Sequence, residues 1–464
     1  VLRFARPAGG WVSHGDSTPP LQGELVVEEV ACGRERPWLN LHTCARVLQG
    51  GARLLWASER TGFRHLYIHD MVGGRELATL TAGDWVVDEV RGVDEASGLV
   101  YFIGAPADAR ERALFVTSLA GGGEPGVAPR APRRLTSAAG WHEVELNHGL
   151  TAFVDVFCSV QEPYRVSLHS LPDGASYSSI FQNADLRLSV LHLPPPELLN
   201  IKNRHGHTLH AAVYRPPAGR ASSAPLPLIV SCYGGPDIQI VTNSWGLTAA
   251  MREQFFAQEG FLVMRLDNRG SARRGTAFES ALHEDMGSAE VDDQADGVRH
   301  LVSLGLADPD RVGVIGWSYG GYLSLMCVCR APEVFRAAVA GAPVTHWDGY
   351  DTHYTERYMG SPASNPEAYS RSSVMRHVAG MADSARLLLV HGLLDENVHF
   401  RHTARLIDAL IKRRKRYDLL LFPNERHTPR RLADRVYMEQ RILEFFQSAL
   451  GSGTGTARMS KSRR

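Results

Sequence analysis

Ser318 lies within residues 316–321, which read Gly-Trp-Ser-Tyr-Gly-Gly. A Gly-x-Ser-x-Gly step between a strand and a helix turns sharply enough to expose the serine hydroxyl as a nucleophile for acyl transfer. In a chain this rich in glycine and serine, chance alone produces roughly a few tenths of a match. The motif therefore predicts chemistry only together with its context, and the alternative is an ordinary turn that holds a passive serine.

The sequence on both sides of the motif supports a strand followed by a helix. Residues 311–315 form a short apolar run with two valines and an isoleucine, and the turn signal Asp-Pro-Asp precedes them at 308–310. Residues 320–330 begin with small side chains and continue with apolar ones, as in a helix packed on that strand. Flanking glycines allow the sharp turn and the close approach of a substrate.

A serine hydroxyl is a weak nucleophile at neutral pH, so it needs a histidine base and a carboxylate that orients the histidine. Asp395 follows the strand-like run 386–391, and His427 follows the strand-like run 417–422. The order serine, acid, histidine, with each residue on a loop after a strand, is that of the α/β-hydrolase fold. This order is far more specific than the serine motif.

Four other residues compete for the base and acid roles. His391 ends a strand, and His399 and His402 fall at the start of a helix-like stretch, so we interpret all three as structural. Glu396 is adjacent to Asp395 and stays an alternative acid, although consecutive loop residues point in different directions.

Acyl transfer also needs hydrogen-bond donors for the oxyanion of the tetrahedral intermediate. One should be the backbone N–H of Tyr319, the residue after the nucleophile. A second can come from the loop after the apolar run 228–232, where Tyr233 precedes Gly-Gly-Pro. That segment could also be a simple tight turn.

The elements around these residues predict two domains and a tail. From residue 196 to 450, apolar strands alternate with helices, which indicates a doubly wound, mostly parallel sheet. Residues 1–195 show short strands with turn signals at a spacing of ~40–50 residues, enough for about four propeller blades. The strands alone fit a sandwich equally well. Residues 451–464 are Gly-, Ser- and Arg-rich, and we expect them to be a disordered tail.

Several motifs across the second half resemble the dipeptidyl peptidase IV branch of the prolyl oligopeptidase family of serine peptidases, in particular dipeptidyl peptidases 8 and 9. The resemblance rests on the serine motif and on matching stretches spread over about two hundred residues. These stretches are residues 233–236, 269–271, 341–345, 354–359, 394–400 and 423–427. It implies a partial β-propeller followed by an α/β-hydrolase domain.

The resemblance assigns a role to each motif residue. It implies that Ser318 is the nucleophile, His427 the base and Asp395 its orienting carboxylate. The Tyr233 hydroxyl and the Tyr319 amide would form the oxyanion hole. The implied activity is release of N-terminal dipeptides after proline or alanine, without a cofactor. The substrate-binding positions that match the family's are Tyr319, Val344, Trp347, Tyr350, Tyr354, Arg357, Asn397 and Val398.

Those positions suit a post-proline peptidase on physical grounds as well. A pyrrolidine ring is compact and rigid, so aromatic walls can bury it at little entropic cost. In the family Asn397 would hold a substrate carbonyl and Arg357 would support the amine end. Without the resemblance, Trp347, Tyr350 and Tyr354 would more often be core or surface aromatics.

Two departures from the family limit the resemblance. Many relatives have Asp-Gly-Arg-Gly-Ser where this chain has Asn268, a loop change that we expect to be neutral. The family also fixes the substrate amine with a carboxylate pair on a helical insertion of the propeller. Glu28 and Glu29 are an adjacent pair, but their neighbourhood resembles a strand downstream of that insertion. We therefore expect a chain that is truncated at its start and lacks the carboxylate clamp. Two alternatives follow: a less selective hydrolase of the prolyl oligopeptidase clan, or a catalytically silent interaction module.

Composition excludes several other functions. The 50 basic and 50 acidic residues give a net charge of zero, which argues against a nucleic-acid partner. No apolar run reaches the ~18 residues of a membrane helix. Six cysteines without a CxxC pattern favour reduced thiols and a cytoplasmic location, and no histidine or cysteine cluster suggests a metal site. The expected partners are peptides with proline or alanine in second place, with a homodimer as a further option.

Overall fold

The structure, a computed structural model, describes residues 2–4, 23–31, 33, 35–121, 129–217 and 225–451. Apart from Gly451, the expected tail lies outside the described residues. The chain divides into two compact units. The first holds residues 1–157, 164–183 and 273–277, and the second holds 158–163, 184–272 and 278–464. No helix among the described residues is long and apolar enough to cross a bilayer.

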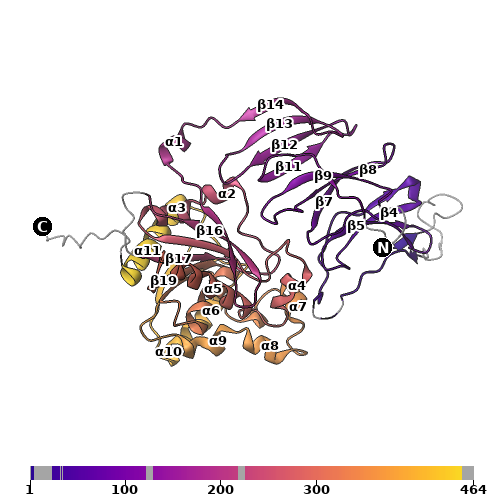
Figure 1. The fold of residues 1–464 in the computed structure, drawn as a ribbon. Coiled ribbons are helices and arrows are strands. Elements are labelled where there is room, and N and C mark those ends of the chain that lie inside the picture. Colours follow the sequence, from indigo (N-terminus) through magenta and orange to yellow (C-terminus); the bar gives the residue numbers. More distant parts are fainter. Residues whose placement is uncertain are drawn as a thin grey trace. The chain divides into compact units, whose positions relative to one another are not determined.

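The first unit is built from antiparallel sheets (Figure 1). Its described residues form three four-stranded sheets and one two-stranded sheet, where the strand spacing predicted about four blades. The two-stranded sheet pairs β1 (Leu2–Phe4) with β2 (Gly23–Leu25). The first four-stranded sheet contains β3 (Arg46–Leu48), β4 (Arg53–Ser58), β5 (His65–Asp70) and β6 (Glu76–Thr79); the second β7 (Val87–Asp94), β8 (Leu99–Gly104), β9 (Ala113–Ser118) and β10 (Arg133–Arg134); the third β11 (Trp141–Leu146), β12 (Ala152–Cys158), β13 (Arg165–Ser170) and β14 (Ser176–Gln182).

The middle sheet of this unit is buried on both faces. Along β8, Val100 and Phe102 join a hydrophobic cluster with residues of the first sheet. The alternate residues Tyr101 and Ile103 join a separate cluster with residues of the third sheet. Because side chains alternate between the two faces of a strand, these sheets stack in sequence as propeller blades do. This stacking fits a partial propeller better than a two-layer sandwich.

The second unit is a doubly wound sheet of eight strands in the order β15-β16-β18-β17-β19-β20-β21-β22. The first two pairings are antiparallel and the remaining five are parallel. This is the expected α/β-hydrolase architecture. The strands are β15 (Glu197–Lys202), β16 (Thr208–Tyr214), β17 (Leu226–Cys232), β18 (Leu262–Asp267), β19 (Ala307–Trp317), β20 (Ala337–Gly341), β21 (Arg386–Gly392) and β22 (Asp418–Phe422).

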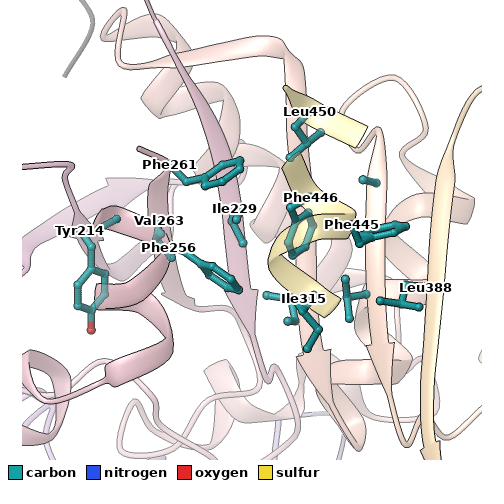
Figure 2. Close-up of a cluster of buried hydrophobic side chains, with 14 of the residues drawn as sticks. Tyr214, Ile229, Phe256, Phe261, Val263, Ile315, Leu388, Phe445, Phe446 and Leu450 are labelled. Atoms are coloured by element: carbon teal, nitrogen blue, oxygen red, sulfur yellow. The ribbon is translucent and has the colours of Figure 1, made fainter. Parts of the chain in front are cut away.

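Helices cover both faces of this sheet. Figure 2 shows one face, where Phe256 of α3 and Phe446 of α11 pack against strand residues such as Ile229 and Ile315. On the other face α5 and α6 pack against each other and against β19. The helices are α1 (Arg187–Leu191), α2 (Trp245–Thr248), α3 (Met251–Gln258), α4 (Thr276–Glu279), α5 (Ala289–Ser303), α6 (Tyr319–Arg330), α7 (Thr352–Met359), α8 (Pro366–Arg371), α9 (Val374–His377), α10 (Arg401–Lys412) and α11 (Leu432–Leu450). The 3-10 turns are Ser280–Leu282, Trp347–Gly349 and Val378–Gly380, and a further one, Gln49–Gly51, lies in the first unit.

Parallel strands bring their carboxyl ends to one edge of the sheet, where ligands of doubly wound folds bind. Ser318 follows β19 directly, Asp395 lies three residues beyond β21, and His427 lies five residues beyond β22. Tyr233 follows β17. The topology therefore gathers four residues that are distant in the sequence at one edge of one sheet.

Candidate active site

Ser318 occupies a strained turn between β19 and α6. Its backbone has φ 60° and ψ −115°, a combination that non-glycine residues rarely adopt. The backbones also approach closely here, since a Cβ on Gly316 would lie 2.2 Å from the carbonyl oxygen of Gly320. The turn is held by the Ser318 N–H, which donates to Gly341 O at 2.8 Å. Strain of this kind at a serine motif is typical of a nucleophile elbow.

Asp395 accepts hydrogen bonds on both carboxylate oxygens. Oδ2 lies 2.8 Å from Nδ1 of His427, and Oδ1 accepts the backbone N–H groups of Asn397 and Val398, each at 2.9 Å. The Asp395 side chain is fully buried, whereas that of His427 is 27% exposed. Burial favours the neutral acid, but hydrogen bonds from His391 and His427 outweigh it and hold the pKa of Asp395 below its ordinary value.

The loops that carry Asp395 and His427 are joined by backbone hydrogen bonds. Leu393 N–H donates to Phe422 O and Leu394 N–H donates to Glu425 O, both at 3.0 Å. The carbonyl of His427 in turn accepts the indole N–H of Trp317 at 2.7 Å. His427 is therefore hydrogen-bonded through its backbone to the residue that precedes Ser318.

The structure separates Asp395 from its neighbour Glu396. Glu396 pairs with Arg426 at 2.7 Å, and both side chains are more than half exposed. The interior carboxylate beside His427 is that of Asp395. A loop residue that points outward cannot orient the imidazole, which removes the alternative that the sequence left open.

The other histidines have structural contacts. His391 is fully buried, and its Nε2 lies 2.8 Å from Val398 O, so this nitrogen carries the proton. The same nitrogen lies 3.2 Å from Asp395 Oδ2. His402 Nδ1 accepts the Thr345 N–H at 3.2 Å, and its Nε2 donates to Gly349 O at 3.1 Å. His391 thus contacts the carboxylate of Asp395, a role that the sequence analysis did not find.

The rings of the two residues expected to supply the oxyanion donors lie near each other. Tyr319 begins α6, so its backbone N–H is one of the free donors of the first turn. The rings of Tyr233 and Tyr319 have centroids 6.2 Å apart. Burial raises the pKa of the Tyr233 phenol, which keeps its hydroxyl protonated and able to donate.

The predicted aromatic positions of the substrate site form one cluster of rings. Trp347 lies 5.4 Å from Tyr319, 6.0 Å from Tyr350 and 6.3 Å from Tyr354 between ring centroids. Val344 and Val398 are buried, at 2% and 0% exposed. Tyr322 also belongs to the cluster, 5.1 Å from Trp347. Sequence reasoning missed Tyr322, although its position three residues after Tyr319 on a helix places it on the same face.

Asn397 and Arg357 lie at the edges of this cluster. The Tyr350 hydroxyl donates to Asn397 Oδ1 at 3.0 Å, which fixes the amide and leaves its Nδ2 hydrogens to donate elsewhere. Arg357 lies on α7, and its guanidinium is 5.8 Å from the ring centroid of Tyr358. Within the described part of the chain, no group of three or more metal-binding side chains comes together.

Comparisons with known proteins match both units. Residues 24–164 match the dipeptidyl peptidase IV N-terminal region, and residues 248–453 match the prolyl oligopeptidase family. The chain therefore carries a region of the dipeptidyl peptidase IV N-terminal type followed by a domain of the prolyl oligopeptidase family. Its resemblance to the dipeptidyl peptidase IV branch of this family, predicted from the motifs, is confirmed.

Three relatives within the family show the extent of the match. Mouse dipeptidyl peptidase 8 is 37% identical over 94% of this chain and 52% of its own length. The probable dipeptidyl-aminopeptidase B of Neosartorya fischeri is 30% identical over 88% of this chain and 44% of its own. The crystal structure of Porphyromonas gingivalis dipeptidyl peptidase 4 superposes with a TM-score of 0.77 at 27% identity, covering 88% of this chain and 56% of that one. The chain spans about half the length of the curated relatives it matches.

Proposed function

We propose that the protein is a serine exopeptidase that releases dipeptides from peptide N-termini after proline or alanine. The observation that carries the proposal is the hydrogen bond of 2.8 Å between His427 and the buried Asp395, beside a strained serine turn. Relatives named dipeptidyl peptidase and dipeptidyl-aminopeptidase support the same reaction.

In the proposed mechanism Ser318 Oγ attacks the carbonyl of the second residue while His427 Nε2 takes the hydroxyl proton. Asp395 accepts the Nδ1–H of His427, which selects this tautomer and stabilises the imidazolium. His427 then returns the proton to the leaving amine, so the peptide bond breaks and an ester to Ser318 remains. Water, activated by the same imidazole, hydrolyses that ester and regenerates the serine.

The tetrahedral intermediate carries a negative oxygen that needs donors. We assign these to the Tyr233 hydroxyl and the Tyr319 N–H. The raised pKa of Tyr233 supports this role, because a protonated phenol donates a hydrogen bond. Donors fixed before the reaction stabilise the developing charge without a reorganisation cost.

The proposed proline site is the aromatic cluster around Trp347. Rings from α6, from the 3-10 turn Trp347–Gly349 and from α7 are grouped there, and the α6 ring is that of Tyr319, which directly follows Ser318. The free Nδ2 hydrogens of Asn397 would hold the substrate carbonyl. We propose that Arg357 supports the amine end, in line with its position on α7 beside Tyr354.

The test combines a mechanism probe with a pair of substrates. A fluorophosphonate probe should label Ser318 in the wild type and leave Ser318→Ala unlabelled. Gly-Pro-p-nitroanilide should be cleaved much faster than its N-acetylated form. Equal rates on the two substrates would instead favour a less selective hydrolase of the same family. Folded protein that resists the probe would favour a silent interaction module.

The location and assembly of the protein stay predictions. Four of the described cysteines, Cys44, Cys232, Cys327 and Cys329, are free and buried, which supports the proposed reducing, cytoplasmic setting. Subcellular fractionation tests the location, and sedimentation velocity tests the homodimer.

A further inference from the structure

Helix α5 places two polar side chains one turn apart beneath the active site. Glu290 and Gln294 are separated by four residues, so they lie on the same helix face. Both are 0% exposed. Each is hydrogen-bonded toward one of the two segments that carry a proposed oxyanion donor.

Glu290 holds the elbow side. Its Oε1 accepts the Tyr319 hydroxyl at 2.6 Å. The N–H of Gly287 donates to both Glu290 oxygens, at 2.8 and 2.9 Å, so the carboxylate is fixed from its other side. Burial raises the pKa of Glu290 to about 7, against the opposing effect of these hydrogen bonds. The ring of Tyr319 is thereby held at its hydroxyl, and Tyr319, whose backbone N–H is the proposed donor, is the first residue of α6.

Gln294 holds the Tyr233 side through Asn268. Gln294 Nε2 donates to Asn268 Oδ1 at 3.0 Å and to Leu266 O at 3.1 Å. Asn268 is 0% exposed, and its Nδ2 donates to Gly234 O at 3.1 Å and to Arg269 O at 2.7 Å. Gly234 directly follows Tyr233. The side chain of Asn268 therefore bridges α5 and the loop that carries Tyr233.

The contact at Gly234 is close. This residue has φ +79°, and a Cβ there would lie 2.9 Å from Asn268 Oδ1 and 2.3 Å from Leu323. The backbone of the Tyr233 loop thus lies directly against the Asn268 amide. Asn268 is the position at which we expected a neutral loop change. Its side chain is fully buried and has three polar partners.

The residues next to Asn268 and Gln294 in the sequence hold the loop after β18 against α5. Arg269 donates through Nε and Nη2 to Asp293, whose carboxylate also accepts the Arg269 N–H at 2.8 Å. Asn203 donates to the same carboxylate at 2.8 Å. These bonds attach the loop to α5, but they reach neither Tyr233 nor Tyr319. They provide a matched control for the Gln294–Asn268 contact.

We propose that α5 acts as a brace that positions both oxyanion donors, Tyr319 through Glu290 and Tyr233 through Gln294 and Asn268. The inference rests on the proposed function of these two tyrosines. Glu290, Gln294 and Asn268 are positioning residues, because none of them meets the reacting atoms. A rigid helix with both contacts on one face fixes the two donors relative to each other.

The brace has a kinetic consequence. The oxyanion exists only after attack, so loosening its donors slows acylation and leaves substrate binding largely intact. Displacement of a donor by about 1 Å can cost up to ~10²-fold in rate. We expect Asn268→Ala to lower kcat about 10-fold on a small ester substrate, with KM changed less than about twofold.

The matched control is Asn203→Ala. It removes a buried asparagine that also bonds to α5, but whose other side-chain hydrogen bonds are with the N–H groups of His205 and His207 and not with the Tyr233 loop. We expect it to lower the melting temperature as much as Asn268→Ala does while it leaves kcat near the wild-type value. On the other arm, Glu290→Gln retains an oxygen acceptor and should keep more of the rate than Glu290→Ala.

Hydrogen exchange separates the brace from the function. In the full 464-residue chain, amide exchange in peptides covering 233–235 should speed up in Asn268→Ala and stay unchanged in Asn203→Ala. Wild-type protein that neither reacts with a fluorophosphonate nor cleaves the ester refutes the proposed function, and exchange still decides the brace. Equal kcat and equal exchange in Asn268→Ala and Asn203→Ala would overturn the brace.

Discussion

Trp317 donates its indole N–H to the backbone carbonyl of His427 at 2.7 Å, across 110 residues of sequence. The residue before the proposed nucleophile thus holds the residue proposed as its base. The bond acts on the backbone of His427 and leaves its imidazole Nδ1 to Asp395. We therefore expect the distance between the proposed nucleophile and the proposed base to depend on Trp317, which has no proposed part in the chemistry.

Replacing Trp317 tests this tie. Trp317→Phe keeps an aromatic ring but removes the donor, and one hydrogen bond contributes ~1 kcal/mol, so we expect kcat to fall about fivefold. Steady-state kinetics with a thermal melt measures both effects. Trp85→Phe serves as the control, because it removes an indole bond to Ala82 O of 3.0 Å in the first unit and should leave kcat unchanged. An unaltered kcat in Trp317→Phe would contradict the tie.

The Tyr233 hydroxyl is predicted to donate a hydrogen bond to the oxyanion. Tyr233→Phe removes a proposed oxyanion donor, and we expect kcat to fall ~10²- to 10³-fold with little change in KM. Tyr214→Phe is the matched control, since it removes a buried hydroxyl that donates to Leu247 O at 2.7 Å. That control should lose stability and retain its rate. If both variants keep the wild-type kcat, Tyr233 has no role as a donor.

Asp395 should make stability depend on acid pH. Its pKa is lowered in the folded state, because hydrogen bonds from His391 and His427 exceed the opposing effect of burial. A carboxyl with a depressed pKa stabilises the fold above its unfolded pKa of ~3.9, and this contribution disappears as the pH falls through the folded value. Urea unfolding between pH 2 and 6 should show wild type and Asp395→Asn converging toward low pH. A constant difference across that range would be evidence against the prediction.

His402 should make the stability of the fold depend on pH in a second, higher pH range. Burial lowers its pKa to about 4, and its neutral form is satisfied by Thr345 N–H and Gly349 O. Because the unfolded chain takes up a proton below ~6.5 and the folded chain only below about 4, stability falls as the pH drops between these values, by about 3 kcal/mol.

The variant His402→Asn removes this titration and keeps an oxygen that can accept the Thr345 N–H. Its unfolding free energy should vary less between pH 6.5 and 4 than that of the wild type. His399→Asn, which replaces an exposed histidine three residues earlier, should leave the slope unchanged. A wild-type slope in His402→Asn would show that another group titrates there.

Much of the fold was predictable from local pattern. Short apolar runs followed by turn residues placed Ser318, Asp395 and His427 after strands, and the structure has β19, β21 and β22 at those positions. The α/β-hydrolase sheet follows from the alternation of apolar strands and helices, because parallel strands need helical crossovers. The propeller was less accessible, since stacking of sheets on both faces of β8 leaves no signal that distinguishes it from a sandwich.

The sequence by itself determined which residue types are present, their order, and the strands that precede them, because these depend on neighbours in the chain. Tertiary structure decided which side chains meet. Asp395 rather than Glu396 faces His427, and Asn268 is buried against Gly234, because backbones distant in the sequence cross at one sheet edge. The first contact depends on the pairing of β21 with β22, and the second depends on the packing of α5, β17 and β18 together. No local pattern encodes the direction in which a loop side chain points.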